Sequence, residues 1–183
     1  MSKQGEVVKI KDLSFEVYLS EQTIKERVSE IGAELSKSYA GKNPIILAVL
    51  NGSFIFAADL ARNISIPCEL TFIKVSSYDG IQSTEELTTH IGLSVSITGR
   101  DVIIVEDIID SGKTMKHLMH ELSSLEPTSI SLVTLLLKPD CLQVDIKPDF
   151  IGFEIPPEFV VGYGLDYDGY GRNLSHIFAL TKE

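Results

Sequence analysis

Residues that could bind a phosphorylated sugar are concentrated between Glu106 and Thr114. Glu106 and Asp107 are adjacent acids. After two isoleucines the chain continues with Asp110, Ser111, Gly112, Lys113 and Thr114. At the start of a helix, unpaired backbone N–H groups and the helix dipole attract anions, so these last residues could wrap a phosphate. The two acids would repel that phosphate, and they suit sugar hydroxyls or a hard cation such as Mg²⁺.

Asp110 separates the two acids from the phosphate-binding residues, and it could be a helix cap, a metal ligand or a base. A P-loop also ends in Gly-Lys-Thr, but it requires glycine five residues before Gly112, where this chain has Asp107. A purely structural turn would leave three acids beside a lysine and two hydroxyls unexplained. The stretch therefore predicts a site for a phosphorylated sugar with a metal ion nearby.

The elements around this stretch are typical of an α/β fold. Residues 102–105 form a short β-branched run, which predicts a buried parallel strand that stops at the two acids. A helix is expected to begin near Gly112, because apolar residues recur behind it at helical spacing: Met115, Leu118, Met119, Leu122 and Leu125. Ligands bind at the carboxyl ends of strands in open α/β sheets, which is where this loop would lie.

Other segments repeat the pattern of strand, turn and helix. Residues 44–50 are apolar and lead into Asn51, Gly52 and Ser53. The helix expected to follow presents Phe54, Ala57, Ala58 and Ala61. Residues 70–75 and 130–137 predict two more strands, and residues 7–18 an edge strand or an irregular arm. Ser20 is expected to cap an amphipathic helix whose stripe is Ile24, Val28, Ile31 and Leu35.

Size and charge limit the possible functions. The chain has 183 residues, 44% of them hydrophobic and 23% charged, which predicts a single globular domain over residues 1–183. No apolar run approaches the roughly 20 residues of a membrane span. The first residues lack the apolar core of a signal peptide. We therefore expect a cytoplasmic protein without a membrane partner, and the net charge of −10 disfavours nucleic acid as a partner.

The pattern of residues 104–114 resembles the phosphoribosyl pyrophosphate motif of type I phosphoribosyltransferases. Two apolar residues, two acids and two apolar residues precede Asp-Ser-Gly-Lys-Thr. The Glu-Asp-Ile-Ile-Asp form is similar to that of hypoxanthine(-guanine) phosphoribosyltransferases. The resemblance extends from about residue 46 to residue 174. It implies a twisted, mainly parallel central sheet flanked by helices, with a small hood formed from the N-terminal and C-terminal segments.

The resemblance also implies a role for each part of the motif. Residues 110–114 would hold the 5-phosphate, and Asp110 would be the base at N7 of a purine. Glu106 and Asp107 would fix the ribose 2- and 3-hydroxyls and act with Mg²⁺. Asp166 would help to hold a metal-bound water, so the predicted metal residues are Glu106, Asp107 and Asp166.

Pyrophosphate would lie between two further segments. Asn51 and Gly52 occupy the family's pyrophosphate loop, where this chain has asparagine in place of the commoner Lys or Arg, which leaves backbone binding. Arg172 would pair with the pyrophosphate through its planar, permanently charged group. Ser77 and Tyr78 resemble the mobile catalytic loop that covers bound phosphoribosyl pyrophosphate and excludes water.

The purine would be held by residues near the end of the chain. Lys138 matches the lysine that bonds the purine 6-oxo group, and an ammonium offers donors only, which favours 6-oxopurines over adenine. By the same resemblance Phe159 stacks on the base and the Val160 backbone bonds its edge.

Together these matches imply an Mg²⁺-dependent enzyme of purine salvage. It would transfer the phosphoribosyl group from phosphoribosyl pyrophosphate to hypoxanthine, with or without guanine, and act as a homodimer or homotetramer. A xanthine-preferring transferase is an alternative. A regulator that binds phosphoribosyl pyrophosphate without catalysis is another, although such a protein should carry a basic face or a DNA-binding module.

Overall fold

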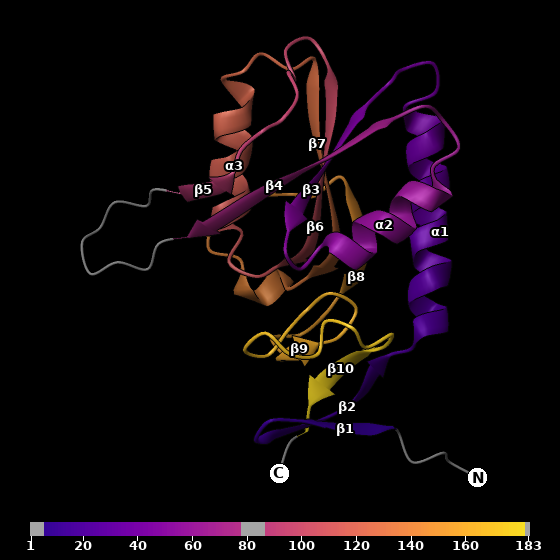
Figure 1. The fold of residues 1–183 in the computed structure, drawn as a ribbon, viewed down its shortest axis with the longest axis vertical. Coiled ribbons are helices and arrows are strands. Elements are labelled where there is room, and N and C mark those ends of the chain that lie inside the picture. Colours follow the sequence, from indigo (N-terminus) through magenta and orange to yellow (C-terminus); the bar gives the residue numbers. More distant parts are fainter. Residues whose placement is uncertain (1–5, 78–86, 182–183) are drawn as a thin grey trace.

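The computed structural model describes residues 6–77 and 87–181, and its centre is a six-stranded sheet in the order β5-β4-β3-β6-β7-β8 (Figure 1). Neighbouring strands are parallel except that β5 runs antiparallel to β4. The strands are β3 (Ile45–Leu50), β4 (Glu69–Ser77), β5 (Leu87–Ile91), β6 (Asp101–Ile109), β7 (Ser129–Leu137) and β8 (Phe150–Glu154). The predicted mainly parallel α/β sheet is confirmed.

Helices cover both faces of this sheet (Figure 1). α1 (Glu21–Ser38) and α2 (Phe54–Asn63) pack on one face, and α3 (Lys113–Ser123) packs on the other. α1 begins as predicted, because the Ser20 hydroxyl accepts the Thr23 backbone N–H at 3.1 Å. Its whole predicted stripe is buried: Ile24, Val28, Ile31 and Leu35.

Two details of the predicted helices are wrong. α2 forms where it was predicted, but of the four residues that indicated it only Ala57 is buried, whereas Phe54 and Ala58 are exposed. The face that packs inward also contains Phe56 and Leu60. α3 ends at Ser123, so Leu125 lies beyond it and is exposed.

The strand before the motif is longer than predicted. β6 does not stop at Glu106 and Asp107 but continues to Ile109, because β7 still pairs with it at Ile108 and Ile109. Side chains of β6 alternate between the two faces of the sheet, and this alternation shifts by one residue at the two acids. Ile103 and Ile108, an odd number of residues apart, both pack on the α1 and α2 side, while Ile109 packs on the α3 side. The acids thus lie where the strand changes which face it buries.

The chain ends form a second, antiparallel sheet, the hood, in the order β1-β2-β10-β9. Its strands are β1 (Val7–Ile10), β2 (Leu13–Leu19), β9 (Val160–Val161) and β10 (Ile177–Leu180). They bury a separate apolar cluster that includes Phe15 and Phe178. Figure 1 shows the hood at one end of the main sheet, next to the short 3-10 helix η1 (Pro139–Cys141) that follows β7. Carboxyl ends of the parallel strands therefore face the hood.

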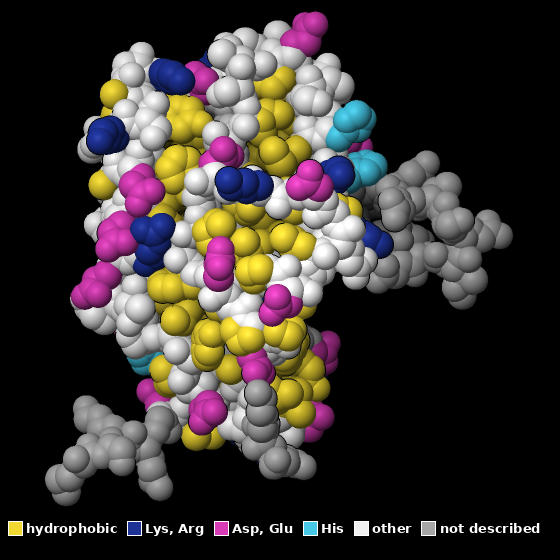
Figure 2. Space-filling view, turned by 180° about the vertical axis from the view of Figure 1, so that it is seen from behind, with side chains coloured by type: hydrophobic (Ala, Val, Ile, Leu, Met, Phe, Trp, Pro, Cys, Tyr) yellow, Lys and Arg dark blue, Asp and Glu magenta, His cyan; other side chains and the backbone are white. Residues whose placement is uncertain are grey.

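The surface mixes charges of both signs. On the face seen in Figure 2, Lys and Arg side chains are separated from one another by acidic and apolar side chains. Within the described residues, no helix is both long enough and apolar enough to cross a membrane.

Candidate active site

The site lies where the chain changes direction in the main sheet. β3 and β6 are neighbours, but β3 is followed by β4 on one side and β6 by β7 on the other. A crevice for ligands forms at such a switch point, outside the carboxyl ends of the strands. The loop that follows β3 contains Asn51, Gly52 and Ser53, and the loop that follows β6 contains Asp110, Ser111 and Gly112. Two of the predicted binding segments are thus brought together by the sheet.

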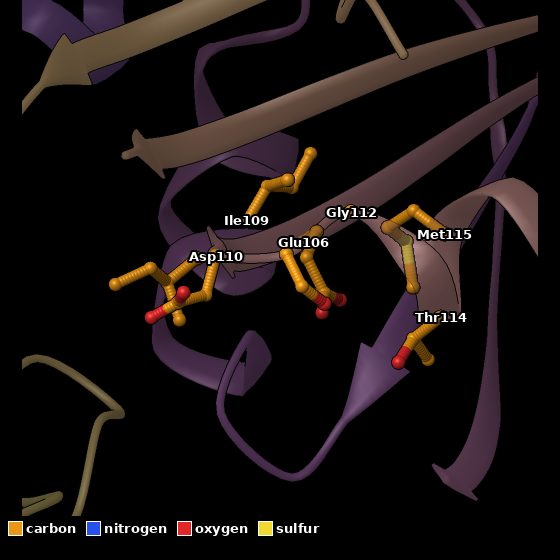
Figure 3. A pocket seen from close by; sticks show the side chains of 8 residues that line it. Glu106, Ile109, Asp110, Gly112, Thr114 and Met115 are labelled. Atoms are coloured by element: carbon orange, nitrogen blue, oxygen red, sulfur yellow. The ribbon is translucent and has the colours of Figure 1, made fainter. Parts of the chain in front are cut away.

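A cavity of about 140 Å³ lies against the end of β6. Five of its lining residues were predicted for the site: Glu106, Asp110, Ser111, Gly112 and Thr114. Figure 3 shows the carboxylates of Glu106 and Asp110 on the same side of the strand as the Thr114 hydroxyl, while Ile109 points the other way. The cavity therefore has hydroxyl and carboxylate groups directed into one space.

At the start of α3, beside this cavity, the chain has no room for a side chain at Gly112. Gly112 caps α3 with a φ of +78°, a left-handed conformation that favours glycine. A Cβ on Gly112 would lie 2.7 Å from Cγ2 of Ile146. The Ser111 hydroxyl accepts the Lys113 backbone N–H at 3.4 Å, and the Ser111 carbonyl accepts the Gln143 N–H at 3.0 Å. Residues 142–146 thus support the loop from behind and leave the start of α3 beside the cavity.

The two adjacent acids on β6 have raised pKa values. Burial raises the pKa of Glu106, and the nearby charge of Asp107 raises it further. Burial likewise raises the pKa of Asp107 to about 6, although backbone N–H groups and the charge of Arg172 partly oppose it. Oε2 of Glu106 is buried and has no hydrogen-bond partner among the described residues. Such an oxygen normally has a partner, so a ligand group is expected beside it.

We expect Asp107→Asn to change how stability depends on pH. The folded protein keeps the Asp107 proton up to about pH 6, whereas an unfolded chain releases it near 3.8, so stability falls as pH rises between these values. Asp107→Asn should therefore melt at a higher temperature than wild type at pH 7.5, and the gap should close towards pH 4. Thermal melts across this range test the prediction, with exposed Asp145→Asn as control. Parallel curves for wild type and Asp107→Asn would contradict it.

Lys138 and Asp110 form an ion pair at the purine end of the predicted site. Nζ of Lys138 donates to Oδ2 of Asp110 at 2.7 Å. Lys138 is only 9% exposed, while Asp110 is exposed. The backbone N–H of Lys138 also donates to the Ile109 carbonyl at 3.0 Å, which ties the ends of β6 and β7 together. The structure therefore places a donor and an acceptor side by side, next to the cavity.

The segments predicted to bind pyrophosphate, at Gly52 and at Arg172, lie close together. A Cβ on Gly52 would lie 1.6 Å from Oδ2 of Asp107, so only glycine fits against that carboxylate. A Cβ on Gly164 would lie 2.0 Å from the Gly52 carbonyl oxygen. Arg172 donates to the Gly164 carbonyl at 2.7 Å and lies 2.6 Å from Oδ1 of Asp166. Asn51 is exposed, and the peptide bond between Leu50 and Asn51 is cis.

The two hood residues predicted for the purine lie in different environments. Phe159 is 43% exposed, and its ring packs at 5.8 Å against Tyr167 and at 6.0 Å against Phe15. Val160 is buried in β9. The Phe159 ring is therefore supported on the hood side and partly open to a ligand.

Not every predicted residue can be placed. Ser77 is the last residue of β4, and Tyr78 lies outside the described residues, so the covering loop stays a prediction. Sequence reasoning also missed Gly164, which packs against the Gly52 carbonyl, and its neighbour Tyr163, which bonds Asp59. Their signal is the Gly-Tyr-Gly pattern of residues 162–164, since paired glycines often mark left-handed backbone.

The acids fit the predicted Mg²⁺ in part. No three acidic, histidine or cysteine side chains of the described residues form a metal-binding group. Both carboxylate oxygens of Asp166 accept protein donors, from Arg172 and from the Gly169 N–H. Mg²⁺ is ordinarily held by one or two carboxylates with substrate phosphates, and Glu106 and Asp107 could supply those carboxylates. The buried, unpaired oxygen of Glu106 fits that use.

Comparison with known proteins supports the same assignment. The phosphoribosyl transferase domain family matches residues 14–168. Hypoxanthine-guanine phosphoribosyltransferase of Dictyostelium discoideum is 40% identical over 176 residues, which cover 93% of this chain and 98% of that protein. A crystal structure of hypoxanthine phosphoribosyltransferase from Staphylococcus aureus has a TM-score of 0.88 and 42% identity, and the match covers 93% of each chain.

Some of the similar proteins are much longer. The bifunctional protein TilS/HprT of Listeria monocytogenes is 43% identical over 168 residues, and this chain spans only about a quarter (26%) of that protein's length. The similarity and the shared fold nevertheless cover almost all of this chain in the shorter relatives. The chain therefore belongs to the phosphoribosyltransferase family and, within it, to the hypoxanthine(-guanine) phosphoribosyltransferases.

Proposed function

We propose that this chain transfers the 5-phosphoribosyl group from phosphoribosyl pyrophosphate to hypoxanthine, with or without guanine, and releases pyrophosphate. The observation that carries this proposal is the pair of Lys138 and Asp110 at 2.7 Å. On a 6-oxopurine, O6 accepts hydrogen bonds, and N7 on the same edge of the base carries a proton when N9 is free to attack. The ammonium suits O6 and the carboxylate suits the N7 proton.

In the reaction, a bond forms between N9 and C1 of the ribose while the bond from C1 to the pyrophosphate oxygen breaks. Asp110 takes the N7 proton as N9 attacks, which is general base catalysis. Residues 110–114 bind the 5-phosphate at the start of α3, so binding energy far from C1 aligns the reacting atoms. Glu106 and Asp107 hold the ribose hydroxyls. The same two carboxylates would hold Mg²⁺, which would supply Lewis-acid neutralisation of the charge on pyrophosphate.

Pyrophosphate leaves between the two segments that converge at Gly52. Backbone groups of residues 51–53, which we call the pyrophosphate loop, and the Arg172 guanidinium bind it. This assignment is supported by the close packing of Gly52 against Asp107 and of Gly164 against Gly52. Asp166 holds Arg172 in place through their 2.6 Å ion pair.

Lys138→Gln is expected to reduce the preference for 6-oxo over 6-amino bases. The ammonium only donates, whereas a glutamine amide can also accept from the amino group of adenine. A hydrogen bond to a charged group contributes about 1.5–3 kcal/mol, so the ratio of kcat/KM for hypoxanthine to that for adenine should fall roughly 10–100-fold. Lys37→Gln, which changes an exposed lysine in the last turn of α1, is the control. An unchanged ratio would remove Lys138 from base selection.

A panel of bases tests the proposed function. The protein is incubated with phosphoribosyl pyrophosphate, Mg²⁺ and each of hypoxanthine, guanine, xanthine and adenine, and nucleotide formation is followed. We expect product from hypoxanthine and little or none from adenine. Preference for xanthine would select the alternative transferase, and no product from any base would favour a regulator. Mg²⁺ dependence, a homodimer or homotetramer, and a cytoplasmic location remain predictions.

A further inference from the structure

One buried side chain joins the hood to the main sheet's helical layer. Residues 162–174, which follow β9, are called the hood loop below. Tyr163 in this loop is 3% exposed, and its hydroxyl donates to Oδ2 of Asp59 at 2.8 Å. Asp59 lies on α2, the helix that begins directly after the pyrophosphate loop. The hydrogen bond therefore connects the hood loop to the element that carries the pyrophosphate loop.

The backbone at Tyr163 is held in a conformation that its residue type rarely adopts. Tyr163 has a φ of +50°, between Gly162 at +99° and Gly164 at +104°. Left-handed backbone at a tyrosine persists only when surrounding contacts fix it. Here these contacts include the Tyr163 backbone N–H, which donates to the Leu174 carbonyl at 2.8 Å, and the hydroxyl bond to Asp59. The position of the loop is thus determined at Tyr163.

Arg172 is coupled to that position. The Gly164 N–H donates to the Arg172 carbonyl at 2.9 Å, and the Arg172 side chain donates back to the Gly164 carbonyl at 2.7 Å. Gly164 itself packs against the carbonyl of Gly52. Any shift of Tyr163 relative to α2 would therefore move the guanidinium relative to the pyrophosphate loop.

We propose that Tyr163 and Asp59 are positioning residues, whose hydrogen bond holds Arg172 beside the pyrophosphate loop and thereby sets the affinity for the pyrophosphate group. This proposal rests on the function proposed above, because it assigns pyrophosphate to Arg172. Neither residue touches the reacting atoms in this scheme. At the purine end, Lys138 follows β7 and lies outside the hood loop, so its contact with the base should be little affected. Phe159 touches the hood loop at Tyr167 but is also supported by Phe15 of β2, so its position should change little.

Conservative variants test the hydrogen bond. Tyr163→Phe removes only the hydroxyl, and Asp59→Ala removes the acceptor. Each variant should raise KM for phosphoribosyl pyrophosphate and weaken pyrophosphate binding roughly tenfold. A change of this size is expected for the loss of one buried hydrogen bond. The double variant should show no further loss. Asp59→Asn keeps an acceptor oxygen and should stay within about twofold of wild type. KM for hypoxanthine should change by less than about twofold in all of them.

A matched control separates positioning from stability. Tyr39, the residue directly after α1, is also buried, at 5% exposure, and its hydroxyl donates to Ser131 near the start of β7 at 2.8 Å. Tyr39→Phe should lower the melting temperature and leave both KM values unchanged. If Tyr163→Phe behaves in the same way, with unchanged pyrophosphate affinity, the positioning role is overturned.

Calorimetry with Mg²⁺ and pyrophosphate keeps this proposal separate from the proposed function, because it requires no turnover. A wild-type protein that makes no nucleotide but binds pyrophosphate would overturn the function, and weaker binding by Tyr163→Phe would still support the positioning role. Equal binding by Tyr163→Phe and wild type would overturn that role. A wild-type protein that neither turns over nor binds pyrophosphate would overturn both.

Discussion

Asp110→Asn is expected to lower kcat by a factor of ~10²–10⁴, the range for loss of a general acid or base, with smaller changes in KM. Asparagine keeps the shape of the side chain and can still accept from Lys138 through its amide oxygen, but it cannot take a proton from N7. The loss should therefore appear in the chemical step and not in binding. Steady-state kinetics with hypoxanthine and phosphoribosyl pyrophosphate measure both quantities.

The neighbouring acid Asp140 provides a matched control for Asp110. It is exposed in η1, two residues after Lys138, and Asp140→Asn removes the same charge without removing the acid paired to Lys138. This variant should retain kcat within about twofold. Wild-type turnover by Asp110→Asn would exclude Asp110 from the chemistry. An equal loss of kcat in both variants would show that the site needs the nearby negative charge and not a base at Asp110.

Gly52→Ala is expected to lower kcat/KM by about 10², because a Cβ there would lie 1.6 Å from Oδ2 and 2.4 Å from Cγ of Asp107. The carboxylate would have to rotate away from the place proposed for the ribose hydroxyls, and a misplacement of about 1 Å at a reacting centre can cost that much. The Gly52 carbonyl also packs against Gly164, so the pyrophosphate loop cannot retreat freely.

Gly92→Ala is the control for Gly52→Ala. Apart from its two chain neighbours, no described residue has a heavy atom within 4 Å of the Cβ that alanine would add at Gly92, so that variant should keep full activity. Circular dichroism and thermal melts establish that both variants fold. Wild-type kcat/KM in folded Gly52→Ala would show that Asp107 is not needed in its observed position.

The order of strand, loop and helix at the motif could be predicted from the sequence, because apolar periodicity and turn residues are local signals. The extent of β6 could not. Glu106 pairs with Thr134 and Ile108 with Leu136 in the neighbouring strand, and the residue types of β6 alone do not predict those partners. Pairing with β7 therefore extends the strand beyond the residues whose own β propensity is high.

The hood shows the same limit for contacts distant in sequence. Only the family resemblance predicted that the chain ends come together, since alternation in residues 7–18 does not say which strand pairs with them. In the structure β2 pairs with β10. Likewise, the resemblance assigned Lys138 and Asp110 to one purine, but the 2.7 Å ion pair between them is a property of the folded chain.

Tyr163 and Asp59 are separated by 104 residues and had no part in the predicted site. A tyrosine between two glycines indicates unusual backbone, but it does not identify a partner on α2. Division into a single domain over residues 1–183, the covering loop at Ser77 and Tyr78, and the role of each site residue remain predictions.

The most direct test of the central claim is the stoichiometry of one reaction. Wild-type protein is mixed with phosphoribosyl pyrophosphate, Mg²⁺ and hypoxanthine, and the phosphorus species are followed by ³¹P NMR. Phosphoribosyl transfer predicts one molecule of inosine monophosphate and one of pyrophosphate for each phosphoribosyl pyrophosphate consumed. Unchanged phosphoribosyl pyrophosphate, or its breakdown to ribose phosphate and pyrophosphate without nucleotide, would contradict the assignment.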